Sequence, residues 1–231
     1  MENYLKAVAQ SYDIAIELGR RGIDPYRELP PHITSHPDYP LFLAMQESGE
    51  LSDSGRREIA EFLAPQAGMR FADLGCCLNL MFRGYRDWPS LYYGVDISPK
   101  TVDLLQAFVR RENIPCGALV CRSMHDTAFA SDFFDIAACI GSLEYFAGDF
   151  AAQVLAELHR VLKPGARAVL DIPRVGSREF GITAMIEESL RRPDRFDLSI
   201  DAFEQLLSPR FTIDHRDTVG PMFQYFLVCK K

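Results

Sequence analysis

The segment Phe71-Ala72-Asp73-Leu74-Gly75-Cys76-Cys77-Leu78-Asn79 is the most informative part of this chain. Its apolar start runs into an acid and a glycine, which is typical of a strand that enters a tight turn before a helix. A second apolar run, 92–95, ends at Asp96, 23 residues after Asp73. Nucleotide-binding α/β folds place a ribose-binding carboxylate about 20 residues further along the chain. The spacing therefore predicts a site for an adenosine-containing cofactor.

Length and composition are those of an ordinary globular chain. The 231 residues suffice for one large α/β domain, and 48% hydrophobic with 25% charged residues is usual for soluble proteins. A net charge of −7 argues against nucleic acid as a partner, because binding phosphate backbones needs clustered Lys and Arg. No apolar run approaches the ~20 residues of a membrane span, and the N-terminus lacks a basic signal region. We expect a cytoplasmic protein that binds neither membranes nor nucleic acid.

Cysteine and histidine usage gives no indication of a metal site. The six cysteines are Cys76, Cys77, Cys116, Cys121, Cys139 and Cys229. None forms a C-x-x-C pair, and the five histidines lack the spacing of metal ligands. Several cysteines lie in apolar runs, where Cys behaves as a small hydrophobe. We expect reduced cysteines and no bound metal.

Strand-like and helical patterns alternate from residue 69 onward. The expected strands are 69–74, 91–97, 116–121, 134–140 and 166–172, and the helices between them are 78–86, 99–111 and 150–162. This alternation predicts a doubly wound α/β fold with a mostly parallel sheet. Helices over 182–192 and 200–207 precede two final strands, 211–218 and 222–229, joined by Val219-Gly220-Pro221. The tight joint predicts a C-terminal antiparallel hairpin and a seven-stranded sheet.

Residues 1–66 are expected to form an N-terminal helical cap or lid on a core of residues 67–231. Apolar residues recur at a helical period over 4–20, which predicts an amphipathic helix. The proline-dense segment 24–40 predicts an ordered loop or lid without regular structure. Ser52-Asp53-Ser54-Gly55 is expected to open another helix.

Five motifs follow one another in an order that carries more information than any one of them. They are Asp73-Leu74-Gly75-Cys76, Gly94-Val95-Asp96-Ile97-Ser98, Phe133-Phe134-Asp135-Ile136, Gly141-Ser142-Leu143-Glu144-Tyr145 and Leu162-Lys163-Pro164-Gly165. With these motifs, the chain from Gly68 to its end resembles the class I S-adenosylmethionine-dependent methyltransferases. The resemblance implies a Rossmann-like core, S-adenosylmethionine as cofactor and methyl transfer as the activity.

The resemblance also implies which residues bind the cofactor. They are Asp73, Gly75, Cys76, Cys77, Asn79, Asp96, Ile97, Ser123, Met124, Gly141 and Ser142. The first turn surrounds the methionine part, and Asp96 accepts hydrogen bonds from both ribose hydroxyls. Ile97 lies against the adenine, whose edge is read by Ser123 and its neighbour. Gly141 and Ser142 face the sulfonium and the substrate.

The residues implied for the substrate side are fewer. Glu144 and Tyr145 are the candidate catalytic residues, because this family often keeps acid/base or substrate-binding groups at these positions. A base is needed only where the acceptor arrives protonated. His36 and Tyr39, in the proline-dense segment, are candidates for substrate contact. Arg174 follows the fifth strand, where it either clamps a substrate carboxylate or phosphate or pairs with an acid.

Three departures from the family pattern support a second hypothesis. Cys77 and Asn79 replace the second and third glycines, and Ser123 replaces an acid that reads the adenine. In this hypothesis the fold is kept, the cofactor is lost, and the pocket catalyses an elimination, a hydrolysis or an intramolecular cyclisation. Glu144, Tyr145 or His125 then acts as the base, and a partner subunit is one further option. We favour methyl transfer, on family analogy and on the retained Asp96.

Several of these residues also have a structural alternative. Asp96 could cap the helix that opens at Ser98, although Ser98 is the better cap, so we favour the ribose role. Asp73 could equally tie the turn through backbone amides. His125 and Asp126 are adjacent and are expected at the surface. The aromatic residues of the N-terminal part either line a substrate cavity or, as we slightly prefer, pack within the lid. They are Tyr4, Tyr12, Tyr26, Tyr39 and Phe42.

The size of the cap and the insertion between Asp171 and Leu207 favour a small-molecule acceptor, because proteins and nucleic acids need an open groove. The same surfaces leave room for a homo-oligomer or a partner subunit.

Overall fold

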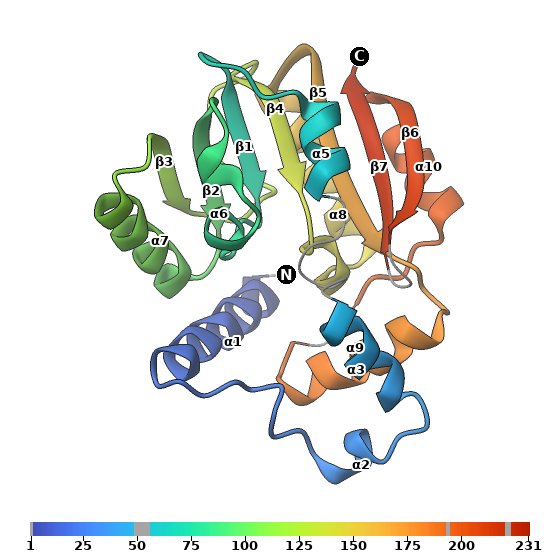
Figure 1. Cartoon of the computed structure of the whole chain (residues 1–231). Coiled ribbons are helices and arrows are strands. Elements are labelled where there is room, and N and C mark those ends of the chain that lie inside the picture. Colours follow the sequence, from blue (N-terminus) through green and yellow to red (C-terminus); the bar gives the residue numbers. More distant parts are fainter. Residues whose placement is uncertain (1, 49–55, 193–194, 220–222) are drawn as a thin grey trace.

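A seven-stranded sheet forms the centre of the computed structural model, which describes residues 2–48, 56–192, 195–219 and 223–231 (Figure 1). The strands are β1 (Arg70–Leu74), β2 (Leu91–Asp96), β3 (Cys116–Cys121), β4 (Phe134–Cys139), β5 (Leu162–Pro173), β6 (Phe211–Val219) and β7 (Phe223–Lys230). Their order in the sheet is β3-β2-β1-β4-β5-β7-β6. Strands β1 to β5 are parallel, and β7 is antiparallel to both β5 and β6. The predicted doubly wound α/β fold with a C-terminal hairpin is confirmed.

Helices cover both faces of this sheet. The helices in the described part of the chain are α1 (Glu2–Arg20), α2 (Pro31–Thr34), α3 (Tyr39–Ser48), α5 (Arg56–Leu63), α6 (Asn79–Phe82), α7 (Pro99–Glu112), α8 (Gly148–Val161), α9 (Arg178–Ser189) and α10 (Ile200–Leu207). Because side chains alternate along a strand, neighbouring residues of β1 belong to different cores. Phe71 packs with residues of α5, α6 and α7, whereas Ala72 and Leu74 pack with residues of α8 and α10.

A third apolar cluster joins the N-terminal segment to the insertion after β5. Ile33 of α2 and Phe42 of α3 pack with Ile182 and Ile186 of α9, and all four side chains are buried. In Figure 1, these helices and α1 lie beyond the carboxyl ends of β1, β4 and β5. Two segments distant in sequence therefore form one cap at the edge where α/β sheets bind ligands.

Helix α5 packs on the sheet, although it precedes residue 67. Ile59 and Leu63 are buried in the same core as Phe71. The Leu63 carbonyl accepts a hydrogen bond from Nη2 of Arg167 in β5, at 2.8 Å. The division into a cap of residues 1–66 and a core of residues 67–231 stays a prediction.

Helix α1 is tied to the start of α7 by one carboxylate. Ser98 caps α7, because its Oγ accepts a hydrogen bond from the Thr101 amide at 3.0 Å. Asp13 Oδ1 in turn accepts from Ser98 Oγ at 2.7 Å and from the Lys100 amide at 3.1 Å. An ion pair of 2.8 Å between Glu17 and Lys100 lies one turn further along α1. These contacts hold α1 against the end of β2.

The expectation that segment 24–40 lacks regular structure is wrong. Helix α2 begins at Pro31, and Pro40 is the second residue of α3. The first four N–H groups of a helix have no partner within the helix, so a proline in the first turn removes no hydrogen bond. Of the prolines in this segment, Pro31 and Pro40 lie in first helical turns, while Pro25 and Pro37 lie in the turns between helices.

Two other elements differ from their expected bounds. The helix expected over 78–86 is replaced by α6 and a short 3-10 turn, η1 (Tyr85–Asp87), separated by Gly84 with a φ of +74°. Helix α9 begins earlier than expected, because Ser177 Oγ accepts from the Phe180 amide and caps it. The expected helix opening at 52–55 and the hairpin joint at 220–221 lie outside the described residues.

The substitution Asp13→Ala tests the attachment of α1. Removing the carboxylate leaves Ser98 Oγ and the Lys100 amide without this acceptor, so we expect the free energy of unfolding to fall by about 1–2 kcal/mol. Amide hydrogen exchange within α1 should also accelerate. Urea denaturation and exchange mass spectrometry measure both effects. Glu17→Gln, which removes only the exposed ion pairs to Lys100 and Arg20, is the control and should change neither.

Candidate functional site

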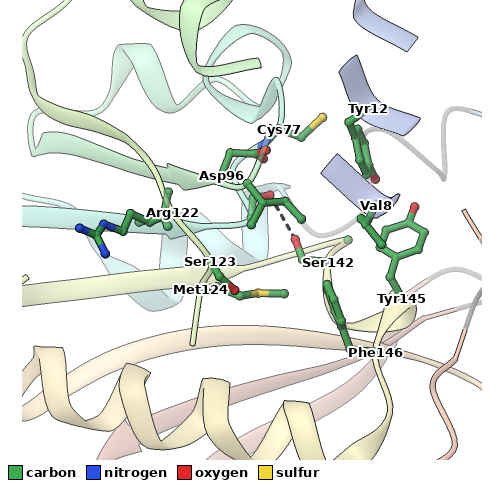
Figure 2. A pocket seen from close by; sticks show the side chains of 14 residues that line it. Val8, Tyr12, Cys77, Asp96, Arg122, Ser123, Met124, Ser142, Tyr145 and Phe146 are labelled. Atoms are coloured by element: carbon green, nitrogen blue, oxygen red, sulfur yellow. Dashed lines mark hydrogen bonds between the residues drawn. The ribbon is translucent and has the colours of Figure 1, made fainter. Parts of the chain in front are cut away.

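A pocket opens at the carboxyl edge of the parallel strands (Figure 2). The empty space between its lining atoms is about 450 Å³, a figure that includes the part open to solvent. Its lining residues come from α1, from the turns after β1, β2, β3 and β4, and from the 3-10 turn η2 (Leu143–Tyr145). They are Val8, Tyr12, Gly75, Cys77, Val95, Asp96, Ile97, Arg122, Ser123, Met124, Gly141, Ser142, Tyr145 and Phe146. Eight of the predicted cofactor residues and Tyr145 are thereby brought together.

The turn after β1 requires glycine at its first position. Gly75 has a φ of +69°, and a Cβ there would lie 2.2 Å from Ser142 Oγ. Ser142 Oγ also donates a hydrogen bond to the Gly75 carbonyl, at 3.1 Å. The backbone of Gly75 in the loop after β1 therefore packs directly on the side chain of Ser142 in the loop after β4, which leaves no room for a methyl group on Gly75.

Cys77 occupies a glycine-like position with a side chain. Its φ is +38°, in the region that costs an ordinary L-residue roughly 1–2 kcal/mol. Its thiol lies in the pocket, where Figure 2 shows the sulfur directed toward Tyr12. Burial, followed by the charge of Asp96, raises the pKa of Cys77 to about 12, so the group stays a neutral thiol.

Asp96 fastens two turns and still faces the pocket. Its Oδ2 accepts from the Cys77 amide and its Oδ1 from the Ser98 amide, each at 2.8 Å. A carboxylate offers about four acceptor sites, so about two stay available to a ligand. Burial raises the pKa of Asp96 to about 6, because removal from water disfavours the charged form. The structural role and the ribose role are therefore compatible.

Three of the predicted cofactor residues lie beneath the turn and do not line the pocket. Asp73 is fully buried, with Oδ2 accepting from the Tyr92 hydroxyl at 2.8 Å and Oδ1 from Asn79 Nδ2 at 3.3 Å. Cys76 is also fully buried and packs in the core of Phe71. Asp73 therefore holds the turn through the side chains of Asn79 and Tyr92. Among the described residues, the backbone amides of the turn, which the sequence offered as alternative partners, are not the groups that it binds.

Beyond the end of β3, Ser123 pairs with His125, a residue expected at the surface. Ser123 Oγ lies 2.6 Å from His125 Nδ1, and the His125 ring packs on Phe150 with 5.0 Å between ring centroids. His125 is half-buried, so the surface expectation is wrong for it, while Asp126 is exposed as expected. Met124 is buried beside these residues and lines the pocket.

An acid that the sequence did not single out supports the loop after β4. Asp171, near the end of β5, is buried, and its Oδ1 accepts a hydrogen bond from the Gly141 amide at 2.8 Å. Gly141 itself has a φ of +66°. Burial raises the pKa of Asp171 to about 6. A lone acid inside an apolar strand pattern is the signal that could have identified this residue.

The two catalytic candidates have different positions. Tyr145 lines the pocket and is 7% exposed. Burial, with nearby Tyr12 and acidic groups, raises the pKa of Tyr145 well above its usual value, so its phenol stays protonated. Glu144 does not line the pocket, and its carbonyl accepts from the amides of Arg195 and Phe196, each at 3.1 Å.

The three candidate substrate residues lie away from the pocket. Tyr39 packs on Phe42 inside the cap, with ring centroids 6.2 Å apart. His36 Nδ1 accepts from the Asp38 amide at 3.1 Å. Arg174 lines a different hollow, at the starts of α9 and α10. Of the aromatic residues in the N-terminal part, Tyr12 reaches the pocket instead.

Within the described residues, no group of three or more His, Cys, Asp or Glu side chains could hold a metal ion. All six cysteines are free thiols. No helix in the described part of the chain is both long and apolar enough to cross a membrane.

Residues 72–170, from β1 into β5, match the family model described as "Methyltransferase domain". A curated sequence described as a probable nonribosomal peptide synthetase, CymA of Salinispora arenicola, is 26% identical over 160 residues. That match covers 65% of this chain and 2% of the length of the synthetase.

Solved structures share the fold at low identity. The cyclopropane synthase MmaA2 of Mycobacterium tuberculosis has a TM-score of 0.69 and 16% identity, covering 98% of both chains. A 1,6-didemethyltoxoflavin-N1-methyltransferase of Burkholderia thailandensis has a TM-score of 0.66 and 14% identity, covering 100% of this chain and 90% of its own. The [4+2]-cyclase SpnF has a TM-score of 0.61 and 17% identity, covering 76% of this chain and 79% of its own.

Residues 72–170 therefore match a methyltransferase domain. The sheet that contains them has the Rossmann-like fold of the class I S-adenosylmethionine-dependent methyltransferases.

Replacing Gly75 by Ala tests the contact between the two loops. The new Cβ would be strained by the positive φ and would also collide with Ser142. We expect a loss of about 3 kcal/mol or more in the free energy of unfolding, from strain plus overpacking. Gly84→Ala is the matched control, since its φ is also positive but nothing lies within 4 Å of the added Cβ. Equal losses in the two variants, measured by urea denaturation, would contradict the collision.

The buried acid Asp171 makes stability depend on pH. Its folded-state pKa of about 6 exceeds the ordinary value of 3.8, so the unfolded state releases the proton first and stability falls between these pH values as pH rises. A shift of this size corresponds to about 3 kcal/mol. The difference in unfolding free energy between Asp171→Asn and the native protein should therefore rise in favour of the variant between pH 4 and pH 7.5. A difference that is independent of pH would show that the pKa of Asp171 is not raised.

Proposed function

We propose that this protein transfers a methyl group from S-adenosylmethionine to a small molecule. The observation that carries the proposal is the gathering of eight of the residues expected to bind the cofactor around one pocket at the carboxyl edge of the sheet. They are Gly75, Cys77, Asp96, Ile97, Ser123, Met124, Gly141 and Ser142. Parallel α/β sheets bind their ligands at this edge.

The residues present fit the cofactor in three respects. Asp96 keeps acceptor capacity for two ribose hydroxyls after fastening the turns. The bare backbone of Gly75 allows close approach to the methionine part. Ile97 and Met124 supply apolar surface for the adenine, and the hydroxyl of Ser123 supplies a polar group at its edge.

The bound cofactor would supply a methyl group that is already activated by the adjacent sulfonium. The chain then has to orient the acceptor and exclude water. Val8 and Tyr12 of α1 and Phe146 close the pocket opposite the sheet. Because Tyr145 stays protonated, we assign it the orientation of the acceptor through its hydroxyl. Where the acceptor has to lose a proton, Glu144 is the candidate base.

The cap supports a small acceptor. Helices α1, α2, α3 and α9 cover the carboxyl edge, which leaves less room for a macromolecular substrate than an open groove would. We also propose a cytoplasmic location and a small-molecule partner, from the composition of the chain and the size of the cap.

A second candidate function keeps the pocket without methyl transfer. The side chain of Cys77 lies where a glycine would leave space for the amino-acid end of the cofactor. The [4+2]-cyclase among the structural neighbours is an example of a protein with this fold and another reaction in its name. The base would then be Glu144 or His125, since Tyr145 stays protonated, and a partner subunit stays an option.

Calorimetric titration with S-adenosylmethionine and S-adenosylhomocysteine separates the two functions. We expect micromolar binding, weakened roughly 100-fold or more in Asp96→Ala, which loses two hydrogen bonds to a charged acceptor. Asp103→Ala, an exposed acid on α7, is the control and should bind as the native protein does. Absence of binding by folded protein would reject methyl transfer and favour the second function.

Binding of S-adenosylhomocysteine should weaken in acid. A protonated Asp96 accepts fewer hydrogen bonds, and its pKa of about 6 means that only about a tenth of it is ionised at pH 5. We expect the Kd to rise about tenfold between pH 7.5 and pH 5. Asp96→Asn should bind more weakly at both pH values and should lack this dependence. The same tenfold rise in the Asn variant would assign the titration to another group.

A further inference from the structure

Two phenol groups of the pocket make no hydrogen bond to any residue that the structure describes. Tyr12 on α1 is half-buried and Tyr145 on η2 is buried, both line the pocket, and their rings meet edge to face with centroids 6.0 Å apart. Figure 2 shows both residues at one end of the pocket and Arg122 at the other. Both hydroxyls are therefore free to donate a hydrogen bond to a ligand in the pocket.

A nearly buried guanidinium lies beside these phenols. Arg192, which follows α9, is 4% exposed, and its Cζ lies 5.1 Å from the centroid of the Tyr12 ring. Its Nε donates to Glu187 Oε2 at 2.6 Å, and its Nη2 donates to the Tyr26 hydroxyl at 2.7 Å. Its third nitrogen, Nη1, makes no hydrogen bond to any residue that the structure describes.

Glu187 and Tyr26 hold this guanidinium in place. The Tyr26 hydroxyl donates to Glu187 Oε1 at 2.8 Å while it accepts from Arg192. The Glu187 carboxylate is therefore occupied by its two partners. A buried ion pair with these added hydrogen bonds is rigid, since loss of either partner would leave an uncompensated charge.

The hydroxyls of Tyr12 and Tyr145 and the Nη1 group of Arg192 can each donate a hydrogen bond. Burial raises the pKa of Tyr12 and of Tyr145 well above the usual value, and the charge of Arg192 opposes the shift without cancelling it. Both phenols therefore keep their protons. A guanidinium donates and cannot accept.

We propose that the Tyr12 and Tyr145 hydroxyls bind a carboxylate group of the methyl acceptor, with the guanidinium of Arg192 on the Tyr12 ring as the nearby positive charge. This inference rests on the proposed function and names the substrate class of the same pocket. A carboxylate offers only acceptors, so one carboxylate can accept from both phenol O–H groups, and such a bond to an ionised acceptor is stronger than one to a neutral group. Glu144 and Glu187 are the acids nearest to this cluster, and Arg192 and Tyr26 already compensate Glu187.

The probe for this site is phenylacetate, whose apolar ring suits Val8 and Phe146 and whose carboxylate suits the donors. Phenylacetamide is the neutral control of nearly the same shape. We expect the protein, with and without S-adenosylhomocysteine, to bind phenylacetate at least about tenfold more tightly than the amide. Titration followed by NMR measures both affinities.

Tyrosine-to-phenylalanine variants provide the matched series. Tyr12→Phe and Tyr145→Phe should each weaken phenylacetate binding about fivefold to tenfold and leave the melting temperature unchanged, because neither hydroxyl has a partner among the described residues. Tyr93→Phe, in the core near β3, should change neither quantity. Tyr26→Phe should lower the melting temperature, since it removes a bridge between Arg192 and Glu187. Arg192 is left intact, because its loss would bury Glu187 unpaired.

Each outcome bears on one proposal at a time. Failure of S-adenosylhomocysteine to bind rejects the proposed function, while phenylacetate binding to the cofactor-free protein still tests the carboxylate site. Equal affinity for phenylacetate and phenylacetamide, no binding of either, or unchanged binding in both phenylalanine variants overturns the site.

Discussion

The close approach of the loops after β1 and β4 is the constraint on which the site depends. Ser142 Oγ donates to the Gly75 carbonyl, and the space that a Cβ of Gly75 would need is filled by the Ser142 side chain. Asp96 joins a third loop by accepting the amides of Cys77 and Ser98. The ends of β1, β2 and β4 are thereby held at fixed distances, and the pocket is the space that they leave at the sheet edge.

The opposite wall of the pocket depends on contacts between distant parts of the chain. Asp13 fastens α1 to the start of α7, which brings Val8 and Tyr12 over the sheet edge. Arg192, from the insertion after β5, then packs against Tyr12 from the cap side. The apolar cluster of α2, α3 and α9 supports that insertion. The cap would therefore supply the residues that contact the substrate, while the loops at the sheet edge would supply those that contact the cofactor.

The alternating pattern and the five motifs predicted the sheet, its direction and the C-terminal hairpin, because parallel strands and their turns have strong local signals. Helix starts have weaker local signals. The proline density of segment 24–40 predicts no regular structure, yet Pro31 and Pro40 lie in first helical turns, where proline is acceptable. The pattern over 78–86 did not reveal that Gly84 divides the helix there. Eight of the eleven residues expected to bind the cofactor line the pocket, whereas His36, Tyr39 and Arg174 do not.

Residue order alone determined that this chain would build a doubly wound sheet with Gly75 and Asp96 at its carboxyl edge, since turn chemistry and strand periodicity are local properties. The tertiary structure decided which side chains share the pocket. Asp73 is buried and accepts hydrogen bonds from Tyr92 and Asn79. His125 forms a hydrogen bond with Ser123. Tyr12, Tyr145 and Arg192, separated by more than a hundred residues, came together because helix packing, and not sequence spacing, brings distant donors to one place.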